Sequence, residues 1–269
     1  MLLRDCCWLW GHPEGRYNEN ADNFGCPDVS RMSPMEACLY LGIRNTFMVP
    51  VGVNVNKRQY NKSFKTLNQV GWECFEACEK PELVDEIINE AKDFENISCV
   101  VIDDFKIEEK GEPRYKRLPV SMLKDLNNKL HNNPVRKLDS WMVLYTFQFG
   151  VNEEEDVEFQ PYMDEFDGVI MWTWQEKDVH LIPEKFELFK KLTPKTRRMV
   201  GCYLYNFGEA KQATSEAVIW QLNYYRELLL KGEIEGIVLH TNTMADLDYE
   251  AYDAAVAWME EHGDEEIPE

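Results

Sequence analysis

The chain has 269 residues, of which 44% are hydrophobic and 29% are charged, an ordinary composition for a globular protein. Its formal net charge of −20 argues against nucleic acid as a partner, because phosphate binding needs a basic surface, and against an anionic membrane. No run approaches the roughly 18 consecutive apolar residues of a membrane span. The apolar N-terminal run lacks the cleavage pattern of a signal peptide, so we expect a cytoplasmic protein.

The eight cysteines indicate reduced thiols rather than a disulfide framework. Five lie in apolar runs where a free thiol behaves as a small hydrophobe: Cys6, Cys7, Cys74, Cys99 and Cys202. The spacing Cys74-x3-Cys78 lacks a second ligand pair at zinc-site spacing. No glycine-rich phosphate loop follows a predicted strand, so no nucleotide or flavin cofactor is indicated.

Short apolar runs alternate with amphipathic stretches eight times along the chain. The apolar runs are 4–10, 45–51, 71–78, 98–105, 140–147, 168–174, 199–206 and 236–241. Most are continuously apolar, which is typical of parallel strands buried on both faces.

Helical patterns fill the intervals between these runs. Six are clear, at 33–40, 82–94, 120–131, 184–192, 215–231 and 247–262, and two are weaker, at 63–69 and 156–166. Several begin at a proline or a capping box, such as Ser33-Pro34-Met35-Glu36. Eight strands alternating with eight helices predict a single closed (β/α)8 TIM barrel over residues 1–263. The acidic tail 264–269 is expected to fray.

The active site of such a barrel lies at the C-terminal ends of its strands. The clearest feature there is Asp103-Asp104, which directly follows the apolar run Val100-Val101-Ile102 and would be costly to bury without partners. Because side chains alternate across a strand, we expect at most one of the two to point into the barrel mouth. The other strand ends contribute polar candidates: His12, Glu73, Tyr145, Gln148, Glu176, Asn206, His240 and Asn242.

Aromatic side chains at the same strand ends suit a sugar ligand. Pyranose C–H faces pack on indole and phenol rings, while amides and carboxylates bond the hydroxyls. The candidate rings are Trp8, Trp10, Trp172, Trp174, Tyr203 and Tyr205, of which we expect about half to face the site and the rest to pack against the helices. Two long loops, 11–32 and 106–118, are expected to cover the site with Arg16, Tyr17, Phe24, Arg114 and Tyr115.

Three strand endings resemble those of bacterial glycoside-hydrolase-like (β/α)8 barrels. They are Val101-Ile102-Asp103-Asp104-Phe105, Met171-Trp172-Thr173-Trp174 and Cys202-Tyr203-Leu204-Tyr205-Asn206, and the likeness spans nearly the whole chain. The resemblance implies a carbohydrate-active enzyme that cleaves a glycan or glycoside, with its acid/base carboxylate after the fourth strand. Asp103 or Asp104 matches that position.

The second carboxylate is harder to assign. Many barrel glycosidases carry the nucleophile after the seventh strand, which here ends in Tyr and Asn, and others place it after the sixth, where Glu176 is nearest. Glycoside hydrolysis needs two carboxyls, about 5–5.5 Å apart for retention and about 6.5–9.5 Å for inversion. Our preferred pair is Asp104 with Glu176 or Glu73, and Asp103 orients it.

Two other functions compete with this hypothesis. A metal-dependent sugar isomerase or epimerase would use Glu73, Asp103 or Asp104, and His240 as ligands, although no HxH motif follows the first strand. A barrel that binds sugar but has lost one carboxylate would be a non-catalytic carbohydrate-binding protein.

Overall fold

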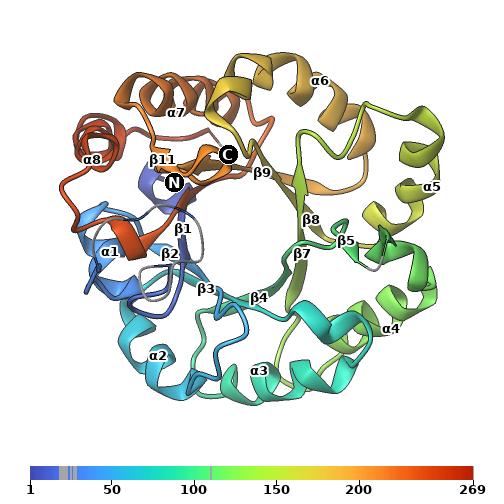
Figure 1. Ribbon diagram of the computed structural model, residues 1–269. Coiled ribbons are helices and arrows are strands. Elements are labelled where there is room, and N and C mark those ends of the chain that lie inside the picture. The colour runs from blue at the N-terminus through green and yellow to red at the C-terminus, as the bar shows by residue number, and fades with distance from the viewer. Residues whose placement is uncertain (18–23, 25, 27–28, 110, 269) are drawn as a thin grey trace.

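The structure is a computed structural model that describes residues 1–17, 24, 26, 29–109 and 111–268. Within these residues, eight strands close into a barrel in the order β1-β12-β9-β8-β7-β4-β3-β2, and the helices form a ring around it (Figure 1). Neighbouring barrel strands are parallel throughout. The predicted single TIM barrel is confirmed.

Each predicted apolar run overlaps one barrel strand. The strands are β1 (Cys7–Gly11), β2 (Asn45–Met48), β3 (Gln69–Glu73), β4 (Ile97–Ile102), β7 (Asp139–Tyr145), β8 (Gly168–Trp172), β9 (Arg197–Tyr203) and β12 (Gly236–His240). The runs overestimate the strand lengths because the chain stays apolar after it turns. After β3, for example, Ala77 and Cys78 are buried in a 3-10 helix rather than in a strand.

Eight α-helices alternate with these strands in the described residues. They are α1 (Pro34–Tyr40), α2 (Lys57–Ser63), α3 (Val84–Glu90), α4 (Val120–His131), α5 (Glu153–Met163), α6 (Ile182–Leu192), α7 (Ser215–Leu230) and α8 (Glu250–His262). The weak prediction at 63–69 was placed too late. The helix begins after Asn56, whose side chain accepts the Gln59 N–H as an N-cap.

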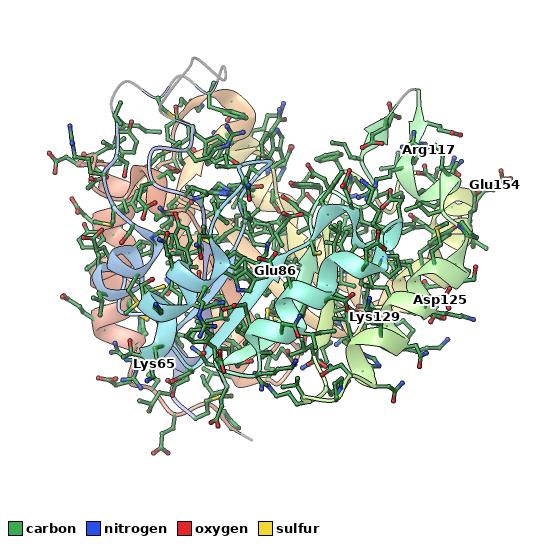
Figure 2. The ribbon with its side chains drawn as sticks, turned by 90° about the horizontal axis from the view of Figure 1, so that it is seen from below. Lys65, Glu86, Arg117, Asp125, Lys129 and Glu154 are labelled. Carbon is green, nitrogen blue, oxygen red and sulfur yellow. The ribbon has the colours of Figure 1, made fainter. Side chains whose placement is uncertain are left out.

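Short elements occupy the connections. The 3-10 helices are η1 (Leu3–Cys6), η2 (Phe64–Thr66), η3 (Phe75–Cys78), η4 (Pro81–Leu83), η5 (Arg114–Arg117), η6 (Glu176–Leu181), η7 (Phe207–Glu209) and η8 (Asn242–Met244). Two small antiparallel pairs, β5 (Glu108–Glu109) with β6 (Glu112–Pro113) and β10 (Tyr205–Asn206) with β11 (Lys211–Gln212), lie in the loops after β4 and β9. In the side view, Arg117 near the β5–β6 hairpin lies at one end of the barrel and Lys65 at the other (Figure 2).

Two strand glycines make room for tryptophans of the neighbouring strand. A Cβ at Gly168 would lie 2.2 Å from the Trp141 ring, and a Cβ at Gly201 would lie 2.1 Å from the Trp172 ring. Glycine inside a strand often marks such a close approach. Both indoles are buried, so each glycine fixes the position of a large ring in the barrel wall.

The two chain termini pack together near the N-terminal end of β1. The Ile267 N–H donates to the Met1 carbonyl at 2.8 Å, Arg4 pairs with Asp264 at 2.8 Å, and Ile267 is buried. The described part of the predicted frayed tail is therefore anchored, because Ile267 supplies an apolar contact that its acidic neighbours hide in the sequence pattern. All eight cysteines have free thiols. None of the described helices has the length and apolar character needed to cross a lipid bilayer.

Candidate active site

Three adjoining hollows open at the C-terminal end of the barrel. The central cavity, of about 380 Å³, collects predicted residues from six strands: Trp10, Asp103, Asp104, Tyr145, Trp172, Trp174, Tyr203 and His240. A second hollow of about 690 Å³ follows β2 and β3 and contains Glu73 together with Asp103 and Asp104. A third of about 500 Å³ follows β4 and β7 and contains Gln148 with Asp104 and Tyr145. Asp104 is the residue common to all three.

Both aspartates after β4 line the central cavity, although strand alternation predicted only one. The strand ends at Ile102, and Asp104 takes a left-handed φ of +49°, which removes the alternation. The Asp104 N–H donates to the Asp103 carboxyl at 2.9 Å. Aspartate tolerates this backbone conformation better than most residues, so the turn brings two carboxyls to one cavity wall.

The surroundings of the two carboxyls differ. Burial, and after it the charges of Asp104 and Glu73, raise the pKa of Asp103 well above its usual value. Burial also raises the pKa of Asp104, but a hydrogen bond from Tyr145 and the positive charge of Arg114 oppose that rise. Where neighbouring groups push the pKa values of two carboxyls apart, one carboxyl can stay protonated while the other is ionised. The pKa of Asp103 is raised further than that of Asp104, so Asp103 holds a proton more readily.

Tyr145 favours the ionised form of Asp104. Its hydrogen bond lowers the pKa of that carboxyl. Burial raises the pKa of the Tyr145 phenol well above its usual value, so the phenol stays protonated and can act as a donor. Tyr203 lies beside Tyr145, and burial raises the pKa of its phenol as well.

Glu73 belongs to the same acidic group. Burial raises its pKa to about 7, against the lowering effect of the Phe75 backbone N–H and of Arg114. Arg114 itself is buried, pairs with Glu79 at 2.8 Å and lies 3.7 Å from the centre of the Phe75 ring. The loop after β4 therefore brings one fixed cation near three carboxyls.

A histidine pair forms part of the opposite wall. His240 lines the central cavity, and His12 lies buried behind it with its Nε2 atom 3.3 Å from the Nε2 of His240. The Asn242 side chain accepts the His12 N–H at 2.7 Å and donates to the His12 carbonyl at 3.0 Å. His12 and Asn242 therefore support the wall, and His240 presents a ring to the cavity.

Besides His12 and Asn242, four predicted site residues line none of the three hollows. Trp8 stacks on Phe47 and faces a hollow at the other end of the barrel. Residues two apart on a strand point to the same face of the sheet, so Trp8 and Trp10 differ in their height along the barrel axis and not in the face they occupy. Tyr205 donates to the Phe24 carbonyl, because β9 ends at Tyr203 and the alternation stops there.

The other two are engaged in local hydrogen bonds. The Asn206 side chain donates to Glu209. Glu176 accepts from the Thr214 N–H at 2.8 Å and from its hydroxyl at 3.2 Å, just before α7. The preferred pairing of Asp104 with Glu176 is therefore not supported by the geometry, and Glu73 is the candidate that adjoins Asp104.

Some residues of the two predicted covering loops line the central cavity, and others pack elsewhere. Arg16, Tyr17 and Phe24 line the central cavity, whereas Tyr115 packs on Phe159 and Tyr162 of α5. Predicted cover residues 18–23, 25, 27–28 and 110 lie outside the described residues.

The apolar lining residues that were missed include Val51, Phe147 and Phe207. Phe147 was predicted as the last residue of the run 140–147, and Val51 has a φ of +51° that nothing in a Val-Pro-Val-Gly run predicts. The position of Phe207 depends on the small β10–β11 pair.

The carboxylates and histidine of the predicted isomerase site do not form a ligand cluster. Among the described residues, the one group with metal-like spacing is His131, Asp139 and Asp167. Lys137 pairs with both of its carboxylates at 2.9 and 3.0 Å, and the group lies where β7 and β8 begin, away from the cavity.

The fold was compared with known proteins. No protein-family model matches the sequence, and no curated protein matches it. Among solved structures, the chain is similar to active domain 2 of a chitinase from Pyrococcus furiosus, with a TM-score of 0.60 and 11% identity over 97% of each chain. The PgaB (BpsB) glycoside hydrolase domain from Bordetella bronchiseptica gives a TM-score of 0.60 and 7% identity over 97% of this chain and 99% of that one.

A third similar structure is the GH99 endo-alpha-mannosidase from Bacteriodes thetaiotaomicron, with a TM-score of 0.56 and 7% identity over 96% of this chain and 98% of that one. The chain shares its closed (β/α)8 barrel fold with these glycoside hydrolases. At these identities the likeness concerns the fold, and the chemistry must be argued from the residues of this chain.

Proposed function

We propose that this protein is a carbohydrate-active enzyme that hydrolyses glycosidic bonds at the C-terminal end of its barrel. The observation that carries the proposal is the Asp103–Asp104 pair, in which two adjoining carboxyls with different surroundings share one aromatic-walled cavity. The likeness of the fold to glycoside hydrolases supports it. Tryptophan and tyrosine rings around the carboxyls suit the apolar faces of a sugar.

Asp103 acts as the general acid. Burial raises the pKa of this carboxyl and so favours its protonated form, and the proton passes to the glycosidic oxygen as the bond to the anomeric carbon breaks. Glu73 assists because a nearby negative charge disfavours the ionised form of Asp103.

Asp104 carries the negative charge. Tyr145 and Arg114 favour its ionised form, which stabilises the positive charge that develops on the sugar ring. Water supplies the hydroxyl that joins the anomeric carbon, and the proton that water releases returns to the Asp103 carboxylate, which restores the acid while Asp104 stays ionised. This assignment exchanges the predicted roles, in which Asp103 was the orienting residue.

The test is hydrolysis of a panel of neutral oligosaccharides (chito-, manno- and gluco-oligosaccharides) followed by chromatography. We expect cleavage of at least one series by the wild type, and a loss of at least about 100-fold in Asp103→Asn. The matched control is Glu82→Gln, which removes an exposed carboxyl and should retain activity. Cleavage by the wild type and by both aspartate variants, Asp103→Asn and Asp104→Asn, at equal rates would rule the proposal out.

A further inference from the structure

We propose that the site takes an internal stretch of a long, non-anionic glycan, with sugar units bound on both sides of Asp104, so that cleavage is internal rather than terminal. This inference rests on the proposed function and deepens it. It starts from the arrangement of the three hollows. A site that binds only the end of a glycan needs one opening, whereas a site that binds an internal stretch needs a hollow on each side of the catalytic carboxyls.

The hollows adjoin one another across the barrel mouth, and together they make up the cleft of this proposal. The central cavity shares Val51, Asp103 and Asp104 with the hollow after β3, and it shares Asp104, Tyr145 and Trp174 with the hollow after β7. The carboxyl that we assign to catalysis thus lies in the middle of the cleft. A glycan that filled both outer hollows would present an internal bond to Asp103 and Asp104.

The hollow after β7 provides an aromatic arm, formed by Tyr145, Phe147 and Trp174. Phe147 is 58% exposed and stacks on Tyr145 with ring centres 5.3 Å apart and planes at 16°. Trp174 meets the same tyrosine edge-on at 6.0 Å. A large aromatic ring left open to solvent beside a catalytic group is a platform on which a sugar face can pack.

The hollow after β3 provides an acidic arm, formed by Glu73, Glu76, Glu86 and Lys57. Lys57 is neutralised by Glu86 at 2.6 Å, and Glu76 pairs with Lys80 at 2.8 Å. In the aromatic arm, Lys106 is likewise paired with Glu155 at 3.3 Å. The lysines of both arms are therefore already paired with carboxylates, whereas Glu73, Asp103 and Asp104 have no ion-pair partner among the described residues.

This charge distribution selects against anionic glycans. Uronate, sulfate or carboxymethyl groups would meet Asp104 in the centre and further carboxylates in both arms, whereas Arg16 is the arginine that lines the central cavity. Like charges at short range cost several kcal/mol. Hydroxyls and ammonium groups, by contrast, find acceptors there. The net charge of −20 adds a long-range repulsion of anions.

The experiment measures the chain-length dependence of cleavage and binding. Reducing-end-labelled chito-, manno- and gluco-oligosaccharides of two to six units are incubated with the wild type, Phe147→Ala, Leu83→Ala and Leu39→Ala. Leu83 lies in the acidic arm, whereas Leu39 is an exposed leucine of α1 outside all three hollows and serves as the control. Affinity is measured in parallel by calorimetry with Asp104→Asn, using the same oligosaccharides and a carboxymethylated glucan.

We expect kcat/KM to rise with chain length, with products released from the middle of the chain. Loss of the exposed ring in Phe147→Ala should lower kcat/KM by about tenfold for six-unit chains and less for two-unit chains, while Leu39→Ala matches the wild type. The carboxymethylated glucan should bind more weakly than the neutral one.

The outcomes separate the two proposals. Release of single terminal sugars at a rate independent of chain length would overturn internal cleavage and leave the hydrolase proposal standing. Affinity that rises with chain length in Asp104→Asn, without turnover by the wild type, would overturn hydrolysis and support the two-armed cleft. Equal binding of neutral and carboxymethylated chains, or binding of neither, would overturn the inference.

Discussion

The imidazoles of His12 and His240 face each other with their Nε2 atoms 3.3 Å apart. The Nδ1 of His12 donates to the Val49 carbonyl at 2.7 Å, so His12 Nε2 carries a lone pair and His240 Nε2 carries the proton. Both rings are buried, which lowers the pKa of His12 to about 4 and that of His240 well below its usual value.

This pair predicts a loss of stability in acid. Because the folded-state pKa lies below the unfolded value of about 6.5, the unfolded chain binds more protons, and the free energy of unfolding falls as pH drops from about 6.5 to 4. His12→Gln should reduce that slope in urea titrations at a series of pH values. His180→Gln, which removes an exposed imidazole, should keep the wild-type slope; equal slopes for all three proteins would contradict the assignment.

Glu73 makes the stability of the fold depend on pH in the opposite direction. Its folded-state pKa of about 7 exceeds the unfolded value of about 4.3, so the folded protein binds more protons and stability falls as pH rises between these values. Glu73→Gln should therefore raise the free energy of unfolding by about 1–2 kcal/mol at pH 8 and leave it nearly unchanged at pH 4. Chemical denaturation at both pH values measures this. A stabilisation of the same size at pH 4 would point to packing rather than charge.

Two glycine substitutions distinguish an effect on oligosaccharide binding from an effect on stability alone. Gly201→Ala would push a Cβ into Trp172 of the cavity wall, and Gly168→Ala would push one into Trp141 at the other end of the barrel. Each should cost about 1–3 kcal/mol of stability. Only Gly201→Ala should also weaken oligosaccharide affinity, measured by calorimetry at a temperature where both variants are folded. Equal weakening in both would show that the effect is global.

Tyr145→Phe tests the support of Asp104. Without the phenol, Asp104 loses a donor that lowers its pKa, so the acid limb of the pH–rate profile should move to higher pH. We expect kcat/KM near neutral pH to fall by about 10–100-fold. A reduced rate with an unmoved acid limb would indicate that Tyr145 contacts only the substrate.

The barrel was predictable from the sequence because strands buried on both faces leave apolar runs, and eight such runs alternate with helices. Strand ends were less predictable. The apolar run 71–78 continues through buried Ala77 and Cys78 after β3 has ended at Glu73, since burial beneath a loop selects the same residues as burial in a strand.

The site was predicted in part. Asp103 and Asp104 were found because a strand end fixes where such residues lie in a barrel, and Trp10, Trp172 and His240 follow from the same rule. Glu176 lies away from the hollows because it enters a 3-10 helix and bonds Thr214, an outcome set by loop conformation. The joint orientation of Asp103 and Asp104 depends on one positive φ, which sequence pattern does not encode.

The central claim is that Asp103 donates a proton to the leaving group, and a leaving-group comparison tests it most directly. Asp103→Asn is assayed against two glycosides of the same sugar, one with an acidic dinitrophenol leaving group and one with an alkyl leaving group. Since the dinitrophenolate needs no protonation, we predict a loss of at least about 100-fold on the alkyl glycoside and a far smaller loss on the dinitrophenyl glycoside. Equal losses on both substrates would contradict the account.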